Sequence, residues 1–334
     1  MVVLNFYGKI QRTCISEKLG LYLSNLPDEE DNNWRKELAE EIELAVKADG
    51  IYQEKIGTSY TSRIGLLYSN VYPERTVPDS FEKEHYYDLA GQMICLSFEY
   101  DYNEMPLGGW DTNCFDGRLC EEDCAEKVVD LINFLAHDNC FPEPIPQWVY
   151  SSNHDGIDHY RIFWGGESSE TYIESLREWG KLFDNFLQSK NDYLLFDYIL
   201  NAVHKDNEYN EYHLMKAYSL CQLFLEKEHE RELDQKMIQF IDDGLNEEEK
   251  GLCASYLRKL RNKIAHGGFE AFENIIEEYA VRFMDDRYDF DYSEYSRKNW
   301  VMLHVCCLLD DVVRNLIRMS LYEKAALESI KNAK

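Results

Sequence analysis

The sequence predicts a two-domain protein in which an α+β domain is followed by an all-α helical bundle. Residues 1–167 contain short runs rich in β-branched and aromatic residues, and turn-forming residues lie between many of them. Residues 168–334 carry apolar residues at intervals of three and four, which is the spacing of amphipathic helices. A chain of 334 residues also exceeds what one hydrophobic core usually organises. We place the junction near residue 168, in the glycine- and serine-rich stretch 165–169.

The first domain is expected to alternate strands with helices. Strands are expected at 2–10, 64–72, 93–102, 148–151 and 160–164, and helices at 33–49 and 121–137. The second domain is expected to form helices at 172–190, 192–204, 211–228, 232–242, 247–266, 269–284 and 297–327. Some apolar residues of the last helix are assigned to the core, with a dimer interface as the alternative; they are Trp300, Leu303, Leu308, Val312 and Leu316.

The composition excludes a globally basic nucleic-acid-binding protein, because the formal net charge is -28. Residues 171–334 hold 22 Lys and Arg against 31 Asp and Glu, a net of -9, which leaves -19 for residues 1–170. The window between Gly251 and Phe269 contains no acid. Its cations are Arg258, Lys259, Arg261 and Lys263. Any RNA site should therefore be local and should lie in this window.

Cysteine usage and hydropathy predict a cytoplasmic protein without membrane contact. The ten cysteines are scattered, and the first residues do not resemble a signal peptide. The most apolar segment, 300–309, is shorter than the roughly 18 to 20 residues that span a bilayer. We expect reduced thiols and no disulfide framework.

The sequence offers two weak candidates for a metal site. Cys114, Cys120 and Cys124, with His137 and Cys140 further on, contain zinc ligands, but their spacing is not that of a paired zinc knuckle. The run 154–159 (HDGIDH) also contains ligand types, but a turn before the strand expected at 160–164 is the favoured interpretation. No phosphate-binding, dinucleotide-binding, nucleophile-elbow or zincin motif occurs. We therefore expect no metal and no cofactor.

The segment with the clearest chemistry is the end of the helix expected at 247–266. On a helical wheel Leu257 and Leu260 share the stripe that faces the bundle, and Arg261 lies at its margin. Asn262 is expected to point away from the stripe. His266 precedes two glycines, which predict a C-terminal cap in the left-handed conformation. A planar guanidinium at the margin of a core stripe suits a phosphate.

The string 261–267 (RNKIAHG), which follows a leucine-rich helix in an all-α domain, resembles the Arg-x4-6-His motif of HEPN domains, especially the Apea-like branch. The resemblance covers roughly residues 170–330 and does not include the first domain. It implies a bundle that dimerises so that two Arg/His pairs meet in one cleft, which in many members cuts RNA without a metal. It implies that Arg261 stabilises the phosphorane, that His266 acts on the 2′-hydroxyl or the leaving 5′-oxygen, and that Asn262 orients the site.

The function expected from this resemblance is a dimeric endoribonuclease that leaves a 2′,3′-cyclic phosphate on tRNA or another cellular RNA. Arg258, Lys259 and Lys263 are the expected RNA-binding residues. The resemblance also suggests a toxin or an anti-phage defence effector of the abortive-infection type, whose acidic first domain binds a protein or phage-derived trigger. The alternative is a non-catalytic HEPN module that serves dimerisation or interaction, such as an antitoxin-like or scaffold protein. A purely structural Arg/His pair at a helix end is the third possibility.

Overall fold

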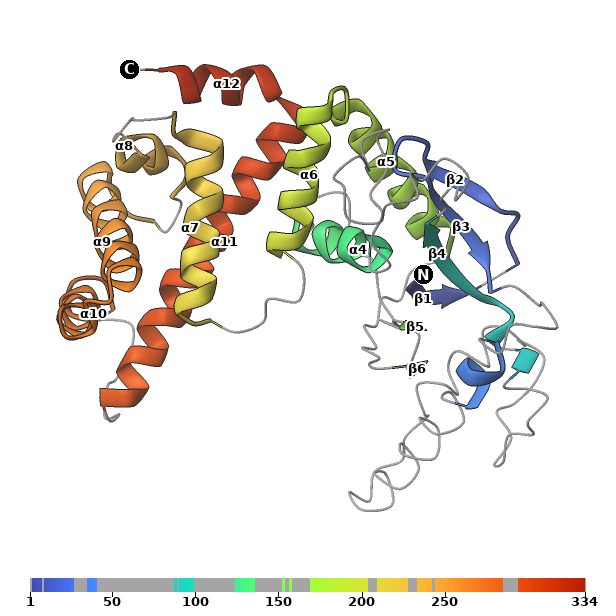
Figure 1. Cartoon of the computed structure of the whole chain (residues 1–334), viewed down its shortest axis with the longest axis horizontal. Coiled ribbons are helices and arrows are strands. Elements are labelled where there is room, and N and C mark those ends of the chain that lie inside the picture. The colour runs from blue at the N-terminus through green and yellow to red at the C-terminus, as the bar shows by residue number, and fades with distance from the viewer. Residues whose placement is uncertain are drawn as a thin grey trace, which may run out of the picture. The chain divides into compact units, whose positions relative to one another are not determined.

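The computed structural model describes much of the chain and divides it into two compact units. The described residues are 2–7, 9–26, 35–40, 87–88, 90–98, 124–135, 152–153, 156–157, 169–203, 209–227, 233–241, 244–284 and 294–333. The units are Met1–Tyr193 and Leu194–Lys334 (Figure 1). The described part is mostly helical and includes a small antiparallel sheet in the first unit. A small α+β region followed by a helical region is therefore confirmed.

The sheet of the first unit has four strands in the order β1-β4-β3-β2, and every neighbouring pair is antiparallel. The strands are β1 (Val2–Tyr7), β2 (Thr13–Ser16), β3 (Leu21–Asn25) and β4 (Met93–Phe98). In β3 the buried Leu21 and Leu23 alternate with more exposed residues, as expected when one face of a strand covers a core. Strands β1 and β4 were predicted from the sequence, whereas β2 and β3 were not.

Two helices pack against this sheet. Helix α4 (Cys124–Leu135) contacts β4, in agreement with the helix predicted at 121–137. Helix α5 (Ser169–Phe186) packs on β2 so closely that a Cβ added to Gly180 would lie 1.8 Å from the carbonyl oxygen of Ile15. The carboxylate of Asp184 on α5 accepts hydrogen bonds from the Ser16 hydroxyl at 2.6 Å and from the Lys18 amide at 3.1 Å.

These contacts explain where the two units divide. The sequence places the junction near residue 168, where the helical pattern begins, but α5 belongs to the unit that contains the sheet. The division falls after Tyr193 because the contacts of α5 with β2 join it to the first unit.

A second, two-stranded sheet pairs β5 (Ser152–Asn153) with β6 (Gly156–Ile157) antiparallel. Asn153 pairs with Gly156, and Ser152 pairs with Ile157. Of the turn predicted at 154–159, only residues 156 and 157 are described. The strands predicted at 64–72, 148–151 and 160–164 lie outside the described residues. Of the helix predicted at 33–49, the structure describes residues 35–40, which are helical.

The described part of the second unit is entirely helical, as predicted. It contains most of α6 (Lys190–Val203), then α7 (Glu211–Leu225), α8 (Leu233–Met237), the 3-10 helix η1 (Ile238–Phe240), α9 (Glu247–Ala265), α10 (Phe269–Phe283), α11 (Glu294–Tyr322) and α12 (Lys324–Asn332). The last predicted helix, 297–327, is in fact two helices, because α11 ends at Tyr322 and α12 begins at Lys324. None of the helices in the described ranges is both long and apolar enough to cross a membrane.

The core of the second unit forms where α7 packs along α11 and where α9 packs against α7, α8 and α10. On α11 the predicted core residues Leu308, Val312 and Leu316 are buried, whereas Trp300 and Leu303 are only half-buried. The core interpretation of the first three residues is therefore confirmed.

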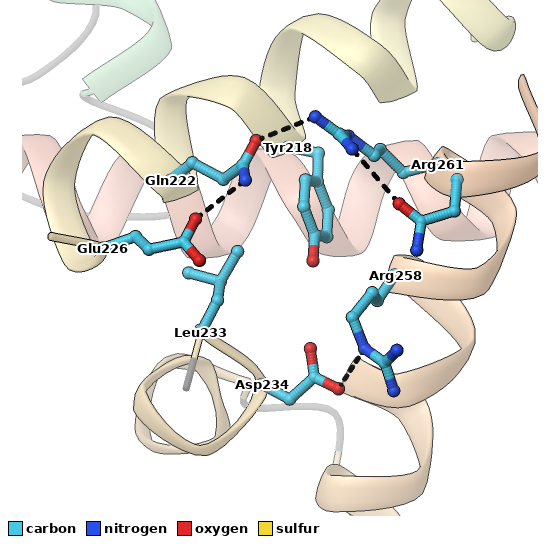
Figure 2. A pocket seen from close by; sticks show the side chains of 8 residues that line it. Tyr218, Gln222, Glu226, Leu233, Asp234, Arg258 and Arg261 are labelled. Atoms are coloured by element: carbon cyan, nitrogen blue, oxygen red, sulfur yellow. Dashed lines mark hydrogen bonds and ion pairs between the residues drawn. The ribbon is translucent and has the colours of Figure 1, made fainter. Parts of the chain in front are cut away.

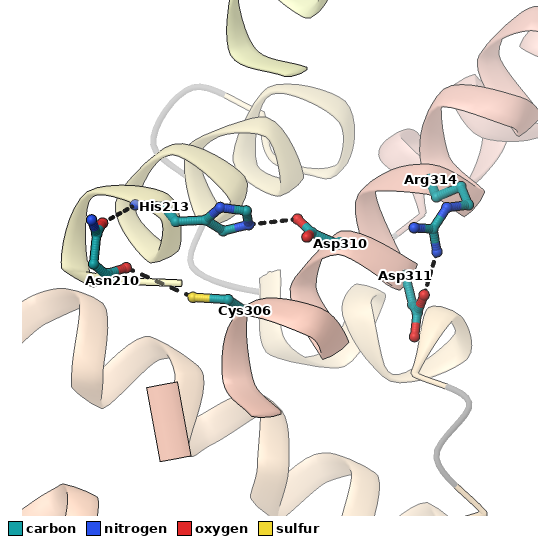
Figure 3. Close-up of polar contacts among 6 residues, drawn as sticks. All are labelled: Asn210, His213, Cys306, Asp310, Asp311 and Arg314. Atoms are coloured by element: carbon teal, nitrogen blue, oxygen red, sulfur yellow. Dashed lines mark hydrogen bonds and ion pairs between the residues drawn. The ribbon is translucent and has the colours of Figure 1, made fainter. Parts of the chain in front are cut away.

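Polar side chains also join α7 to α11 (Figure 3). Asn210 caps α7 by accepting hydrogen bonds from the amides of Tyr212 at 2.9 Å and His213 at 3.1 Å. The ring of His213 is buried, and its Nε2 lies 2.7 Å from Oδ1 of Asp310. A part-buried hydrogen bond between two helices favours one alignment of the helices, because a displacement would break it. No sequence motif indicated this pair.

Candidate functional site

The helix that carries the Arg/His motif, α9, begins at a well-defined cap. Asn246 Oδ1 accepts hydrogen bonds from the amides of Glu248 and Glu249, both at 3.0 Å, and Oε2 of Glu249 accepts one from the Asn246 amide at 3.1 Å. This reciprocal arrangement is a capping box. The acidic first turn also suits the positive end of the helix dipole. The start of α9 is therefore fixed independently of tertiary contacts.

The C-terminal end of α9 is a Schellman motif that holds His266. The Gly267 amide donates to the carbonyl of Ile264 at 3.2 Å, and the Gly268 amide donates to the carbonyl of Lys263 at 2.9 Å. Gly267 has a φ of 67°, so the predicted left-handed cap is confirmed. His266 is the C-cap residue, and its side chain is exposed.

Beside α9 the structure contains a pocket of about 560 Å³ (Figure 2). Its walls come from α8, α9 and the C-terminal half of α7. The lining residues are Tyr218, Gln222, Glu226, Leu233, Asp234, Arg258, Arg261 and Asn262. The lining holds two guanidinium groups and two carboxylates, so its formal charge is balanced. Three of the predicted site residues, Arg258, Arg261 and Asn262, therefore share one cavity.

Arg261 is held in this pocket by neutral acceptors. Its Nη1 donates to Oδ1 of Asn262 at 3.1 Å, and its Nη2 donates to Oε1 of Gln222 at 3.3 Å (Figure 2). Its Nε is buried, and no described residue accepts a hydrogen bond from it. No carboxylate of the described residues forms an ion pair with Arg261. The positive charge of Arg261 is therefore positioned but not neutralised, which suits an anionic ligand.

Gln222 on α7 links Arg261 to the carboxylate of Glu226, the C-cap residue of α7. Its amide oxygen faces Arg261, and its Nε2 donates to Oε2 of Glu226 at 2.8 Å. The amide therefore separates the guanidinium of Arg261 from the carboxylate of Glu226.

Arg258 differs from Arg261 because a carboxylate neutralises it. Its Nε donates to Oδ2 of Asp234 at 2.7 Å. The hydrogen bond and the charge of Asp234 raise the pKa of Arg258 despite its partial burial. Tyr218, which also lines the pocket, is 2% exposed. Burial is the main reason that the pKa of Tyr218 is raised, so its hydroxyl stays protonated.

The remaining predicted site residues lie outside this pocket. Lys259 extends over the ring of Tyr256, with its Nζ 4.6 Å from the ring centre, on the side of α9 that faces α10. Lys263 lies along the capped turn, with Cδ 3.3 Å from where a Cβ on Gly268 would be. The cations of the 251–269 window therefore do not form one patch.

His266 and Arg261 do not share the pocket of a single chain, because His266 is not among the lining residues. Asn262 connects the two residues: its side chain accepts from Arg261, and its backbone carbonyl accepts from the His266 amide at 3.1 Å. The sequence interpretation that Asn262 points away needs correction, because its side chain lines the pocket beside Arg261.

The two candidate metal sites fall mostly outside the described residues. This applies to Cys114, Cys120, His137 and Cys140, and to His154, Asp155, Asp158 and His159. Cys124 is described and is buried at the start of α4. Within the ranges that the structure describes, no three His, Cys, Asp or Glu side chains are placed to hold a metal ion.

Sequence reasoning missed the pocket residues that come from α7 and α8. Tyr218, Gln222 and Glu226 are four residues apart, so they share one face of α7. This polar spacing in an apolar segment was the available signal. The contribution of Leu233 and Asp234 depends on tertiary packing and had no sequence signal.

Comparisons of the chain with protein-family models, with curated proteins and with solved structures found no match.

Proposed function

We propose that this protein is a metal-independent endoribonuclease of the HEPN type that acts as a homodimer. The observation that supports the proposal best is Arg261, whose charge is positioned in a pocket by Gln222 and Asn262 and has no carboxylate partner among the residues that the structure describes. The exposed His266 at the capped end of the same helix supplies a group that can transfer protons. Together they provide charge stabilisation and one of the two proton transfers that transesterification of RNA requires.

In the proposed reaction the 2′-oxygen attacks phosphorus, the bond from phosphorus to the 5′-oxygen breaks, and a 2′,3′-cyclic phosphate forms. The proton of the 2′-hydroxyl passes to a base, and an acid protonates the leaving 5′-oxygen. His266 performs one of these transfers, and Arg261 stabilises the extra negative charge on the phosphoryl oxygens. Asn262 keeps the guanidinium of Arg261 in place.

The proposal combines Arg261 of one chain with His266 of a second copy. Its basis is that His266 lies outside the pocket that contains Arg261 and is exposed, so it is accessible to a partner. A two-fold arrangement would create two equivalent composite sites. The proposal extends to cleavage of tRNA or another cellular RNA in toxin or anti-phage defence, with a protein or phage-derived trigger that binds the acidic first unit.

The test is incubation of the purified protein with total RNA in EDTA, beside Arg261→Ala and His266→Ala. We expect each variant to lose about 100-fold or more in cleavage rate. Arg261→Lys should be impaired as well, because an ammonium lacks the planar fork of donors. Arg282→Gln, which removes an exposed cation from α10, is the matched control and should cleave like the wild type. Equal cleavage by all folded variants would overturn the proposal.

The second candidate function is a non-catalytic interaction or dimerisation module. The Arg258–Asp234 ion pair favours it, because one of the two pocket arginines already has an anionic partner and stabilises the contact between α8 and α9. This function predicts a folded dimer that cuts no RNA with or without the trigger.

A further inference from the structure

The wall of the pocket opposite Arg261 is rich in hydrogen-bond acceptors. Asp234 uses Oδ2 for Arg258, and Glu226 uses Oε2 for Gln222. The second oxygen of each carboxylate makes no hydrogen bond with a described residue. Figure 2 shows the second oxygen of Asp234 directed toward the space beside the Tyr218 hydroxyl. Among the described residues, the pocket therefore has a cation without an ion-pair partner on one side and two carboxylate oxygens without hydrogen bonds on the other.

This polarity defines the ligand chemistry. A simple anion would suit Arg261 but would be repelled by Asp234 and Glu226. An apolar ligand would leave the charge of Arg261 and the second oxygens of Asp234 and Glu226 without compensation from the ligand, which is costly in a cavity. The matching ligand carries a negative group at one end and N–H donors at the other. An RNA nucleotide whose base has an exocyclic amino group meets both requirements, because a carboxylate accepts hydrogen bonds from such amino groups.

The size and position of the cavity agree with this ligand. Its volume of about 560 Å³ lies within the range of pockets that hold small organic molecules. Arg261 forms part of its wall, so a nucleotide whose phosphate contacts this guanidinium has the cavity within reach of its base. The buried Tyr218 keeps its proton and adds a hydroxyl that both donates and accepts.

We propose that this pocket is a base-recognition subsite for RNA, in which Asp234, assisted by Glu226, selects bases that carry an exocyclic amino group. The inference rests on the proposed function, because it assumes that the phosphate of the same nucleotide is bound by Arg261. The subsite is expected to bind guanine, adenine and cytosine, each of which carries an exocyclic amino group. Uracil and hypoxanthine are disfavoured because they lack the amino group.

The test measures binding separately from cleavage. Short fluorescent RNAs with 2′-O-methyl groups cannot be cut by 2′-hydroxyl attack, so their affinity for the full-length protein can be measured by fluorescence anisotropy. Two matched pairs are compared, guanosine with inosine and cytidine with uridine. We expect the member with the amino group to bind about tenfold more tightly in each pair. Asp234→Asn should largely remove this ratio.

Two further variants separate base recognition from structural effects. Asp234→Asn also breaks the ion pair with Arg258, so Arg258→Gln is included to break the same pair while the carboxylate remains. Arg258→Gln removes a cation of the pocket and should weaken the binding of both members of each pair, but the preference for amino bases should remain. Glu270→Gln, which changes an exposed carboxylate in the first turn of α10, should retain it as well. Circular dichroism and unfolding curves establish that each variant is folded.

Each outcome decides between the two proposals. Equal affinity within both pairs, an unchanged ratio in folded Asp234→Asn, or no binding of any RNA would overturn the base-recognition subsite. Cleavage of unmodified RNA without any base preference would overturn the subsite and leave the ribonuclease proposal standing. Preferential binding of amino bases without any cleavage would support the subsite and contradict the ribonuclease.

Discussion

Replacement of Gly267 by alanine tests the geometry that positions His266. Gly267 has a φ of 67°, and a Cβ added there would have no atom within 4 Å. The cost of Gly267→Ala is therefore confined to the backbone. The left-handed conformation costs a non-glycine residue roughly 1–2 kcal/mol, and alanine recovers about 0.4–1 kcal/mol by restricting the unfolded chain. We expect the free energy of unfolding to fall by about 1 kcal/mol, which lowers Tm by about 4 °C.

Gly251 provides a matched control on the same helix. It lies inside α9 with an ordinary helical φ, and an added Cβ would meet only Cδ1 of Ile238, at 3.5 Å. Gly251→Ala should therefore raise the free energy of unfolding by roughly 0.5–1 kcal/mol, because alanine favours a helix interior. Thermal unfolding followed by circular dichroism compares the two variants. Equal stability of Gly267→Ala and the wild type would refute the left-handed cap.

Three further predictions concern the second unit. Tyr279→Phe should cost about 1–2 kcal/mol of stability in urea unfolding, because the buried hydroxyl hydrogen-bonds Nδ1 of His304 at 2.9 Å. Burial raises the pKa of Glu211, but its hydrogen bonds and the charge of Lys298 outweigh burial, so the net pKa is lowered. The stability that the ionised Glu211 carboxylate contributes is fully present above the pKa of this carboxyl in the unfolded chain, and it is lost as pH falls through the folded pKa. Lys298→Met should therefore lower the free energy of unfolding at pH 7 and change it little at about pH 3. Cys221 is fully buried and burial raises its pKa, so iodoacetamide should modify it only after unfolding.

These three predictions have clear contrary results. An unchanged urea midpoint for Tyr279→Phe would show that the hydroxyl contributes nothing to the contact between α10 and α11. Destabilisation by Lys298→Met that is equal at pH 7 and pH 3 would show that the Glu211 carboxylate is not the partner that matters. Modification of Cys221 in the native protein, detected by peptide mass spectrometry, would contradict its burial.

The helices of the second unit were predictable because each has an apolar stripe and several have caps in the sequence. Asn246 and Glu249 define the start of α9, and Gly267 defines its end, so both boundaries follow from local chemistry. The break at Glu323 was not predictable, because neither glycine nor proline lies near it. Strand β3 was missed because it is short, although its apolar residues alternate.

The candidate site was only partly predictable. The motif identified Arg261, but its neighbours Gln222 and Asp234 come from other helices, and their approach depends on how α7, α8 and α9 pack. Helical periodicity places Arg258 beside Arg261 on one face, yet it does not indicate that Asp234 neutralises only Arg258. Local pattern therefore predicted Arg258, Arg261 and Asn262, whereas tertiary contacts determine which other residues surround them and what charges those residues carry.

The central claim is that Arg261 of one chain and His266 of another form one ribonuclease site. Co-expression of Arg261→Ala and His266→Ala chains tests it directly by RNA cleavage in EDTA. When the two chains are expressed equally, about half of the dimers contain one chain of each variant. One of the two sites in each mixed dimer keeps both Arg261 and His266. The mixture should therefore regain about a quarter of the wild-type cleavage rate, while each variant alone stays inactive. A mixture as inactive as the separate variants, or wild-type cleavage by either variant alone, would contradict the composite site.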